Sequence, residues 1–312
     1  MNELSSNPVL EFNPNQLEKV RKIFNYGDIN RLHQDIRMFE DWIKMQQHFL
    51  VKEYDKDYLE RYLINSKGSI ERAKKLFDRM CTLRGLMPEY LQGFDIENEF
   101  QNFLRVFDVC LLPKPTAENH RVLYFNISNP DAPLFEHIET ARYTMVALQY
   151  LICHDYNAGV EFVCDTRNFT LGMVSKLSPI VVANTLMIMS EAIGIRMRGM
   201  HLISGSKFID VLVGLVKQGM SKKLQSRLHI HENFESLFKL IPKDLLPKDI
   251  GGNQDTTNKI SEKTFKEFSS PAFIKKVKFL ERAATDETDR LCSKFNEEYS
   301  GMPGSFKVLT VD

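Results

Sequence analysis

The sequence has no apolar run long enough to span a bilayer and no recognisable secretory leader. Its longest apolar stretch, residues 180–195, is interrupted by polar residues such as Asn184 and Glu191, whereas a membrane-spanning helix needs about 20 predominantly apolar residues. The first eight residues contain no basic segment that leads into an apolar one. We therefore expect a cytosolic protein whose contact with membranes is peripheral and transient.

An excess of charge of one sign is also missing, because 41 Lys and Arg residues balance 41 Asp and Glu residues. Overall charge therefore gives no attraction to nucleic acid, and we expect no nucleic-acid partner. The five cysteines are widely spaced and form no C-x-x-C pair, which is typical of reduced thiols in the cytosol. At 312 residues the chain can form one large domain and a smaller one.

Common catalytic motifs are absent: the sequence contains no G-x-G-x-x-G, G-x-x-x-x-G-K-[ST], G-x-S-x-G or H-E-x-x-H. His229 and His231 alternate on a predicted strand, where hydrogen-bonded histidines are commoner than a metal site, which would need a third ligand. Asp165 follows a predicted strand and can cap a turn or act as a catalytic carboxylate, and capping is the commoner role. We expect no catalysis, no cofactor and no metal; a hydrolase that uses Asp165 and His201 is the enzymatic alternative.

Helical and strand patterns divide the chain into three parts. Residues 1–95 predict only helices, with apolar side chains at helical spacing. Residues 96–253 alternate predicted strands (121–127, 160–165, 199–203 and 227–231) with helices (100–106, 136–156, one that begins at Ser178-Pro179, and 207–216), which predicts an α/β fold with a mainly parallel sheet. In residues 254–312 we expect a polar connector, up to about residue 266, and a helix from Ser270 to about residue 296.

Apolar and basic side chains are concentrated in the second part. The segment 207–216 carries an apolar stripe at helical spacing, for which ordinary core packing is the commonest explanation. Residues 196–227 contain many bases and the single acid Asp210. Bases beside an amphipathic helix are typical both of a solvated face and of a membrane-surface element, and the pattern does not choose between them.

Five segments in this order resemble a CRAL-TRIO lipid-binding domain. They are Gly-Val-Glu-Phe-Val-Cys-Asp (159–165), Leu-Ser-Pro (177–179), Ile-Arg-Met-Arg-Gly-Met-His-Leu-Ile (195–203), Ser-Lys-Lys-Leu-Gln-Ser-Arg-Leu-His-Ile-His (221–231) and Leu-Leu-Pro-Lys-Asp-Ile-Gly-Gly (245–252). The resemblance runs from about residue 97 to 253 and is strongest to the branch of the α-tocopherol transfer protein and cellular retinaldehyde-binding protein. Segments 58–63 and 70–76 are similar to the N-terminal helical domain of that family.

The resemblance implies a cup with a mainly parallel sheet as floor, helical walls and a gate helix at residues 204–220. It implies an N-terminal helical domain (1–95), a lipid-binding domain (96–253) and a C-terminal linker with a helix (254–312). The apolar pocket residues that it implies are Tyr143, Val146, Val160, Phe162, Cys164, Leu177, Ile188, Met189, Ile193, Met200, Phe208, Val211, Leu212 and Leu215. The bases that it implies for phosphoinositide binding are Arg196, Arg198, Lys223 and Arg227, with Lys217 as a helper.

By this resemblance the chain is expected to be a monomeric carrier. It would bind a tocopherol, retinoid, carotenoid or similar lipid, transfer it between membranes, and dock through its basic patch. A phosphoinositide-dependent sensor without net transfer is the alternative. The chain departs from the family pattern after the helix that ends near residue 63, where only Lys67 remains of a basic pair. It departs again at Lys217-Gln-Gly219, where the family has a Lys-Pro-Phe turn.

Overall fold

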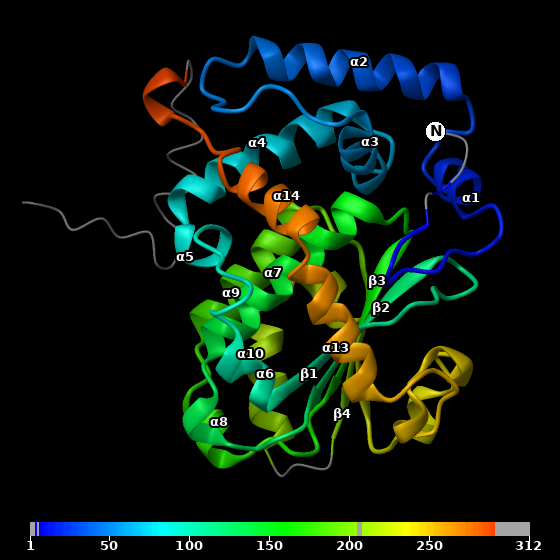
Figure 1. Ribbon diagram of the computed structural model, residues 1–312, viewed down its shortest axis with the longest axis vertical. Helices are drawn as coiled ribbons and strands as arrows, with labels where there is room; N and C mark the ends of the chain where they lie inside the picture. Colours follow the sequence, from blue (N-terminus) through cyan, green and yellow to red (C-terminus); the bar gives the residue numbers. More distant parts are fainter. Residues whose placement is uncertain (1–3, 5, 205–207, 291–312) are drawn as a thin grey trace, which may run out of the picture.

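The computed structural model describes residues 4, 6–204 and 208–290, and its centre is a five-stranded sheet with helices on both faces (Figure 1). The strand order is β1-β2-β3-β4-β5, with β1 and β2 antiparallel and the other neighbours parallel. The strands are β1 (Phe107–Leu111), β2 (His120–Ile127), β3 (Gly159–Asp165), β4 (Met197–Ile203) and β5 (Leu228–His231). The predicted α/β fold with a mainly parallel sheet is confirmed.

The N-terminal part forms a helical layer at one end of the sheet (Figure 1). Its helices are α1 (Gln16–Ile23), α2 (Ile29–Met45), α3 (Lys56–Asn65), α4 (Ile70–Leu86) and α5 (Pro88–Leu91). Their buried apolar side chains belong to the same continuous core as those on one face of the sheet. The helical layer therefore packs directly on the rest of the molecule, and the division of the chain near residue 95 stays a prediction.

The helices of the middle part supply the walls around the sheet. They are α6 (Gln101–Val106), α7 (His137–His154), α8 (Leu171–Ser175), α9 (Pro179–Met187), α10 (Ile209–Gly219), α11 (Lys222–Gln225) and α12 (Phe234–Leu237). As predicted, α9 begins with Pro179 after the cap residue Ser178, whose hydroxyl accepts a hydrogen bond from the Val181 N–H. A π-helical turn, Ile188–Ala192, continues α9. The predicted start of α10 at Lys207 lies outside the described residues.

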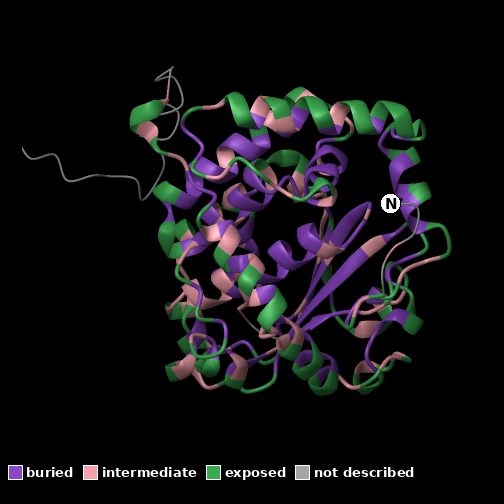
Figure 2. Cartoon of the chain, turned by 45° about the horizontal axis from the view of Figure 1, so that its top comes forward, coloured by how far each residue is buried: buried purple, intermediate pink, exposed green. Residues whose placement is uncertain are grey.

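Alternation along the strands separates the two faces of the sheet, which is largely buried between helices (Figure 2). Val160 and Phe162 of β3 belong to the larger core, which α7 and α9 share. Val163 lies on the opposite face of β3 and belongs to a second core. Leu237 of α12 and Ile260 of α13 cover this core. The first face lies against the walls that enclose the candidate site.

One strand was missed in the sequence, and two predictions near the C-terminus are wrong. The strand β1 was not predicted, because α6 ends at Val106 and the chain straightens into β1 without an intervening turn residue. The supposed connector up to about residue 266 contains helix α13 (Thr257–Phe268), and the last helix, α14 (Pro271–Glu281), ends well before residue 296.

Helix α13 was missed because hydroxyl groups interrupt the apolar side chains of its buried face, which also includes Ile260 and Phe268. Ser261 and Thr264, on that face, accept hydrogen bonds from the backbone N–H groups of Val109 and Leu111 at 3.0 and 3.2 Å. These strand residues are at the edge of the sheet, where N–H groups lack a strand partner. The hydroxyl groups on α13 therefore close the sheet edge, which an apolar stripe could not do.

Candidate functional site: an apolar cavity and a basic groove

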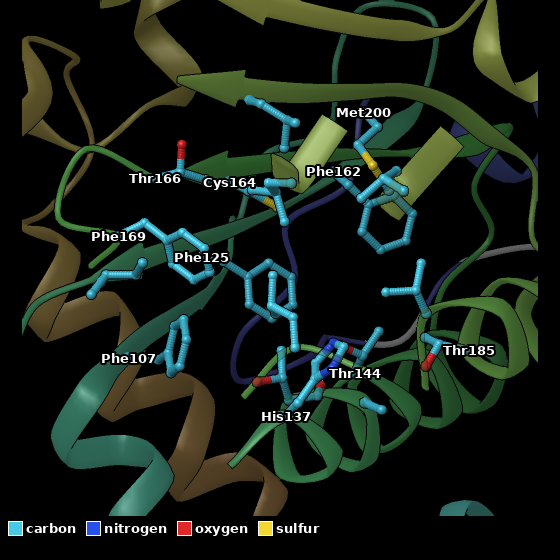
Figure 3. Close-up of a pocket in the computed structure, with 18 of the residues that line it drawn as sticks. Phe107, Phe125, His137, Thr144, Phe162, Cys164, Thr166, Phe169, Thr185 and Met200 are labelled. Atoms are coloured by element: carbon cyan, nitrogen blue, oxygen red, sulfur yellow. Dashed lines mark hydrogen bonds between the residues drawn. The ribbon is translucent and has the colours of Figure 1, made fainter. Parts of the chain in front are cut away.

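An apolar cavity of about 210 Å³ lies between the sheet and helices α7, α9 and α10 (Figure 3). Strands β3 and β4 contribute Phe162, Cys164 and Met200 to its floor, and α10 covers it with Leu212 and Val216. Its complete lining is Phe107, Phe125, Ile127, Phe135, His137, Thr140, Ala141, Thr144, Phe162, Cys164, Asp165, Thr166, Phe169, Leu177, Val182, Thr185, Leu186, Met189, Met200, Leu202, Leu212 and Val216. The lining is mostly aliphatic and aromatic, as in sites for hydrophobic ligands.

The structure brings part of the predicted pocket set together in this cavity. The predicted residues that line it are Phe162, Cys164, Leu177, Met189, Met200 and Leu212. Those that are buried but do not line it are Tyr143, Val146, Val160, Ile188 and Ile193. The predicted residues in and just before α10 that do not line it and are partly or largely exposed are Phe208, Val211 and Leu215.

The orientation of α7 explains one of these differences. Tyr143 points into an aromatic cluster with Phe100 and Phe103, whose ring centroids lie 5.1 and 4.9 Å from its own. Ala141 and Thr144 face the cavity instead. Helical periodicity shows which residues share a face, but α7 is buried on several faces and its sequence does not show which one borders a void.

Aromatic residues from β1, β2 and the loops also line the cavity and were not predicted. Phe125 could have been found, because alternation along β2 places it on the same face as Leu123, which belongs to the larger core. Phe107 could not be found, since its strand was not predicted. Phe135 and Phe169 come from loops, where no periodicity exists, and their rings meet edge to face with centroids 6.4 Å apart.

The titratable side chains that line the cavity are held uncharged or paired. The His137 Nδ1 accepts a hydrogen bond from the Ser178 N–H at 2.8 Å, and burial lowers the pKa of this imidazole to about 4. Burial raises the pKa of the Cys164 thiol to about 12, with a smaller contribution from Asp165. The carboxylate of Asp165 pairs with Arg167 at 2.8 Å.

Helix α10 lies against α9 and forms the outer wall of the cavity. Gly219, its last residue, allows this close approach, because an added Cβ would lie 3.0 Å from Leu186 Cδ1 and 3.2 Å from Ala183 Cα. On the outer side of α10, the Val211 side chain is 48% exposed. One side of α10 therefore covers the cavity while another presents apolar surface to the surroundings.

A basic groove of about 700 Å³ lies on the other side of α9 and of the end of α10. We define it by its cationic lining, which consists of Lys67, Arg72, Arg196, Arg198, Lys223 and Arg227. None of these six makes an ion pair with any residue of the described chain. The one acid of the groove, Glu191, pairs with Arg79 at 2.6 Å.

Two glycines let the groove form. Gly194 ends the π-helical turn with a φ of 72°, and an added Cβ would lie 2.6 Å from Leu76 Cδ1 of α4. Gly159 leaves room for the Arg198 side chain, whose Cγ would lie 2.6 Å from an added Cβ. The chain can therefore enter β4 close to α4, which brings Arg196 and Arg198 beside the bases of the helical layer.

Crowding of like charges and burial perturb two of these bases. The pKa of Arg196 is lowered to about 9, first by burial and then by Arg198 and Arg72. The pKa of Lys67 is lowered by burial and then by neighbouring bases, Lys223 first. The Arg196 guanidinium also donates to the Ile64 carbonyl at 2.7 Å and lies over the Phe24 ring. The protein thus holds cations together at an electrostatic cost, as sites for polyanions do.

The groove contains Arg196, Arg198, Lys223 and Arg227, the four bases for which the resemblance implied a phosphoinositide site. The expected helper Lys217 is exposed and does not line the groove. Arg72 does line it and was missed, because it lies more than 100 residues before these four bases along the chain and only the packing of α4 on the π-helical turn brings it beside them.

The histidines of β4 and β5 contact one another, and Asp165 contacts the turn that follows β3. The His231 ring nitrogens are within 3.0 Å of His201 Nδ1 and 3.1 Å of Ser236 Oγ, and His229 stacks on His201. Asp165 accepts a hydrogen bond from the Arg167 N–H at 3.2 Å and so caps its turn. In residues 4, 6–204 and 208–290, no three His, Cys, Asp or Glu side chains are grouped so that they could hold a metal ion.

Comparison with known proteins finds similar sequences and one similar structure. Clavesin-1 of Xenopus laevis is 25% identical over 255 residues, which cover 77% of this chain and 73% of that protein. Alpha-tocopherol transfer protein-like of Mus musculus is 20% identical over 222 residues, which cover 70% of this chain and 64% of that protein. The crystal structure of Sfh5 aligns with a TM-score of 0.47 and 12% identity, over 76% of this chain and 91% of that one. Among the helices that the structure describes, none has both the length and the apolar character of a membrane span. Residues 108–252 match the family model of the CRAL/TRIO domain, and this part of the chain is similar to that family.

Proposed function

We propose that this protein carries a hydrophobic small molecule between membranes without catalysing a reaction. The observation that supports this most directly is the apolar cavity under α10, directly beside a groove of six bases that have no acidic partner in the described chain. The cavity would hold the ligand, and the groove would bind the anionic head group of a phosphoinositide. The protein would act as a monomer that attaches to the membrane only transiently.

The energetics suit a carrier better than a permanent store. Enclosing roughly 400–500 Å² of apolar ligand surface favours binding from water by on the order of 10 kcal/mol before association costs are subtracted. A membrane offers the ligand an equally apolar environment, so exchange between protein and bilayer is close to balanced. Net transfer is then set by the acceptor membrane and by the rate at which the cavity opens.

The position of α10 links docking to opening. Leu212 and Val216 cover the cavity, while Gly219 at the end of the same helix lines the basic groove. Leu186 of α9 lines both spaces. A head group bound in the groove would therefore touch the end of the gate, and the exposed Val211 would enter the membrane interface as the gate swings.

A charge-matched pair of double variants tests this proposal. Lys67→Glu/Lys223→Glu reverses two charges of the groove, and Lys217→Glu/Lys222→Glu makes the same net change at exposed lysines outside it. Each base near an anionic surface contributes about 1 kcal/mol, so loss of two bases alone should weaken binding to phosphoinositide vesicles by roughly 30-fold, and the two added acids should weaken it further. The control should bind nearly as the unmodified protein does.

Transfer is then measured with a fluorescent tocopherol analogue that moves from donor vesicles to acceptor vesicles with or without phosphatidylinositol bisphosphate. A carrier moves the probe faster to phosphoinositide acceptors, and the groove variant loses this acceleration. A protein that binds the probe but moves none would be a sensor. Equal transfer by both double variants would refute docking through the groove.

A further inference from the structure

The helical wall of the cavity carries most of its polar side chains, and Asp165 and Thr166 lie at the end of strand β3. Figure 3 shows His137 and Thr144 on this wall, across the cavity from Phe162 and Met200 of the sheet. His137 and Thr140 are three residues apart on α7, so they share one face of the helix. A ligand in the cavity would meet an apolar floor and a small polar patch opposite.

The first member of this patch offers a hydrogen-bond donor. Because the His137 Nδ1 accepts from the Ser178 N–H at 2.8 Å, the neutral ring carries its proton on Nε2. No hydrogen bond occupies this Nε2–H within the described chain. The ring lines the cavity, so the free N–H is available to a bound molecule.

The second member is the hydroxyl of Thr140, which is buried and has no hydrogen-bond partner in the described chain. The three other threonine hydroxyls of the cavity donate to backbone carbonyls at distances between 2.6 and 2.8 Å; these are Thr144, Thr166 and Thr185. Only Thr140 therefore keeps its hydroxyl hydrogen uncommitted. A buried polar group without a partner is costly, and a ligand atom would remove that cost.

The charges around the cavity restrict the ligand further. The described lining contains neither Lys nor Arg, and its one acid, Asp165, is already bound by Arg167 at 2.8 Å. A carboxylate or phosphate in this cavity would be buried without a counter-ion, which is strongly unfavourable.

We propose that the cavity selects a neutral lipid that carries one acceptor oxygen, a hydroxyl or a carbonyl, and binds that oxygen through His137 Nε2–H and the Thr140 hydroxyl. This inference rests on the proposed carrier function and adds the chemical class of the ligand. It makes His137 and Thr140 specificity-determining residues.

Four probes with one isoprenoid chain and different ends test the inference: farnesol, farnesal, farnesoate and the hydrocarbon farnesene. Binding is measured by displacement of a fluorescent lipid, at a pH where farnesoate is ionised. We expect farnesol and farnesal to bind best and farnesoate to bind at least about 30-fold more weakly than farnesol, because its charge stays unpaired. Thr140→Val keeps the side-chain shape and should weaken farnesol roughly fivefold, the effect of one lost hydrogen bond, while farnesene is unaffected. Thr140→Ser, the matched control, should keep the preference for farnesol.

The outcomes separate the two proposals. If farnesoate or farnesene binds as tightly as farnesol, or if Thr140→Val leaves the ratio of farnesol to farnesene affinity unchanged, the ligand class is wrong although the cavity still takes a hydrophobic guest. If no probe of the series binds and no lipid is taken up from vesicles, the carrier function fails, and the ligand class fails with it.

Discussion

Arg72 provides a sharp test of the basic groove, because only the folded chain brings it there. It lies in the first turn of α4 with an exposed side chain. Its charge also lowers the pKa of Arg196, an effect smaller than that of burial and that of the Arg198 charge. Lys217 is its natural control: it is also exposed but lies in the last turn of α10, outside the groove. The compared variants are Arg72→Gln and Lys217→Gln.

The two variants should differ in affinity for phosphoinositide vesicles. Loss of one base from the groove removes about 1 kcal/mol of attraction to an anionic surface, so Arg72→Gln should bind about fivefold more weakly at low salt. The difference should shrink as salt is added, because exposed charges are screened. Lys217→Gln should bind almost as tightly as the unmodified protein. Vesicle co-sedimentation at two salt concentrations measures both.

The two variants should change the free energy of unfolding in directions opposite to each other. Arg72→Gln removes a positive charge from a helix N-terminus and relieves repulsion by Arg196, so the free energy of unfolding should rise by roughly 0.5 kcal/mol, a small gain because solvent screens the exposed side chain. Lys217→Gln removes a favourable charge from a helix C-terminus and should lower it slightly. If Arg72→Gln binds vesicles normally, or if Lys217→Gln loses as much affinity, Arg72 does not belong to the binding groove.

Two further predictions concern the fold. Thr264→Val should lower the free energy of unfolding by about 1–3 kcal/mol, because it leaves the Leu111 N–H of the edge strand buried without an acceptor. Urea denaturation measures this change. The control Thr185→Val loses only a hydrogen bond within its own helix and should change the free energy of unfolding little. Three histidines that are buried or partly buried have pKa values lowered from 6.5 to about 4, chiefly by burial; these are His137, His154 and His231. Because the unfolded chain binds protons at these sites first, stability should fall between pH 6.5 and pH 4 as the pH is lowered. A urea midpoint that stays constant from pH 7 to pH 5 would contradict this.

Patterns within single elements made much of the fold predictable. Alternation along β3 separated Phe162 from Val163 correctly, and the Ser178-Pro179 pair marked the start of α9. These signals are reliable because they depend on the local geometry of one strand or one helix terminus. Helix α13 was missed because the hydroxyl groups on its buried face, Ser261 and Thr264, have a role only beside the edge strand to which they bond.

The sequence by itself determined the order of most elements (β1 and α13 excepted), the alternating faces of the strands, the apolar stripe of α10 and the family resemblance. Only the tertiary structure decided that Arg72 joins the groove, that Tyr143 turns away from the cavity, and that Thr140 lines it without a partner. The physical reason is that periodicity reports how one element is exposed or buried. Which buried face borders a void, and which distant charges converge, depends on how several elements pack against one another.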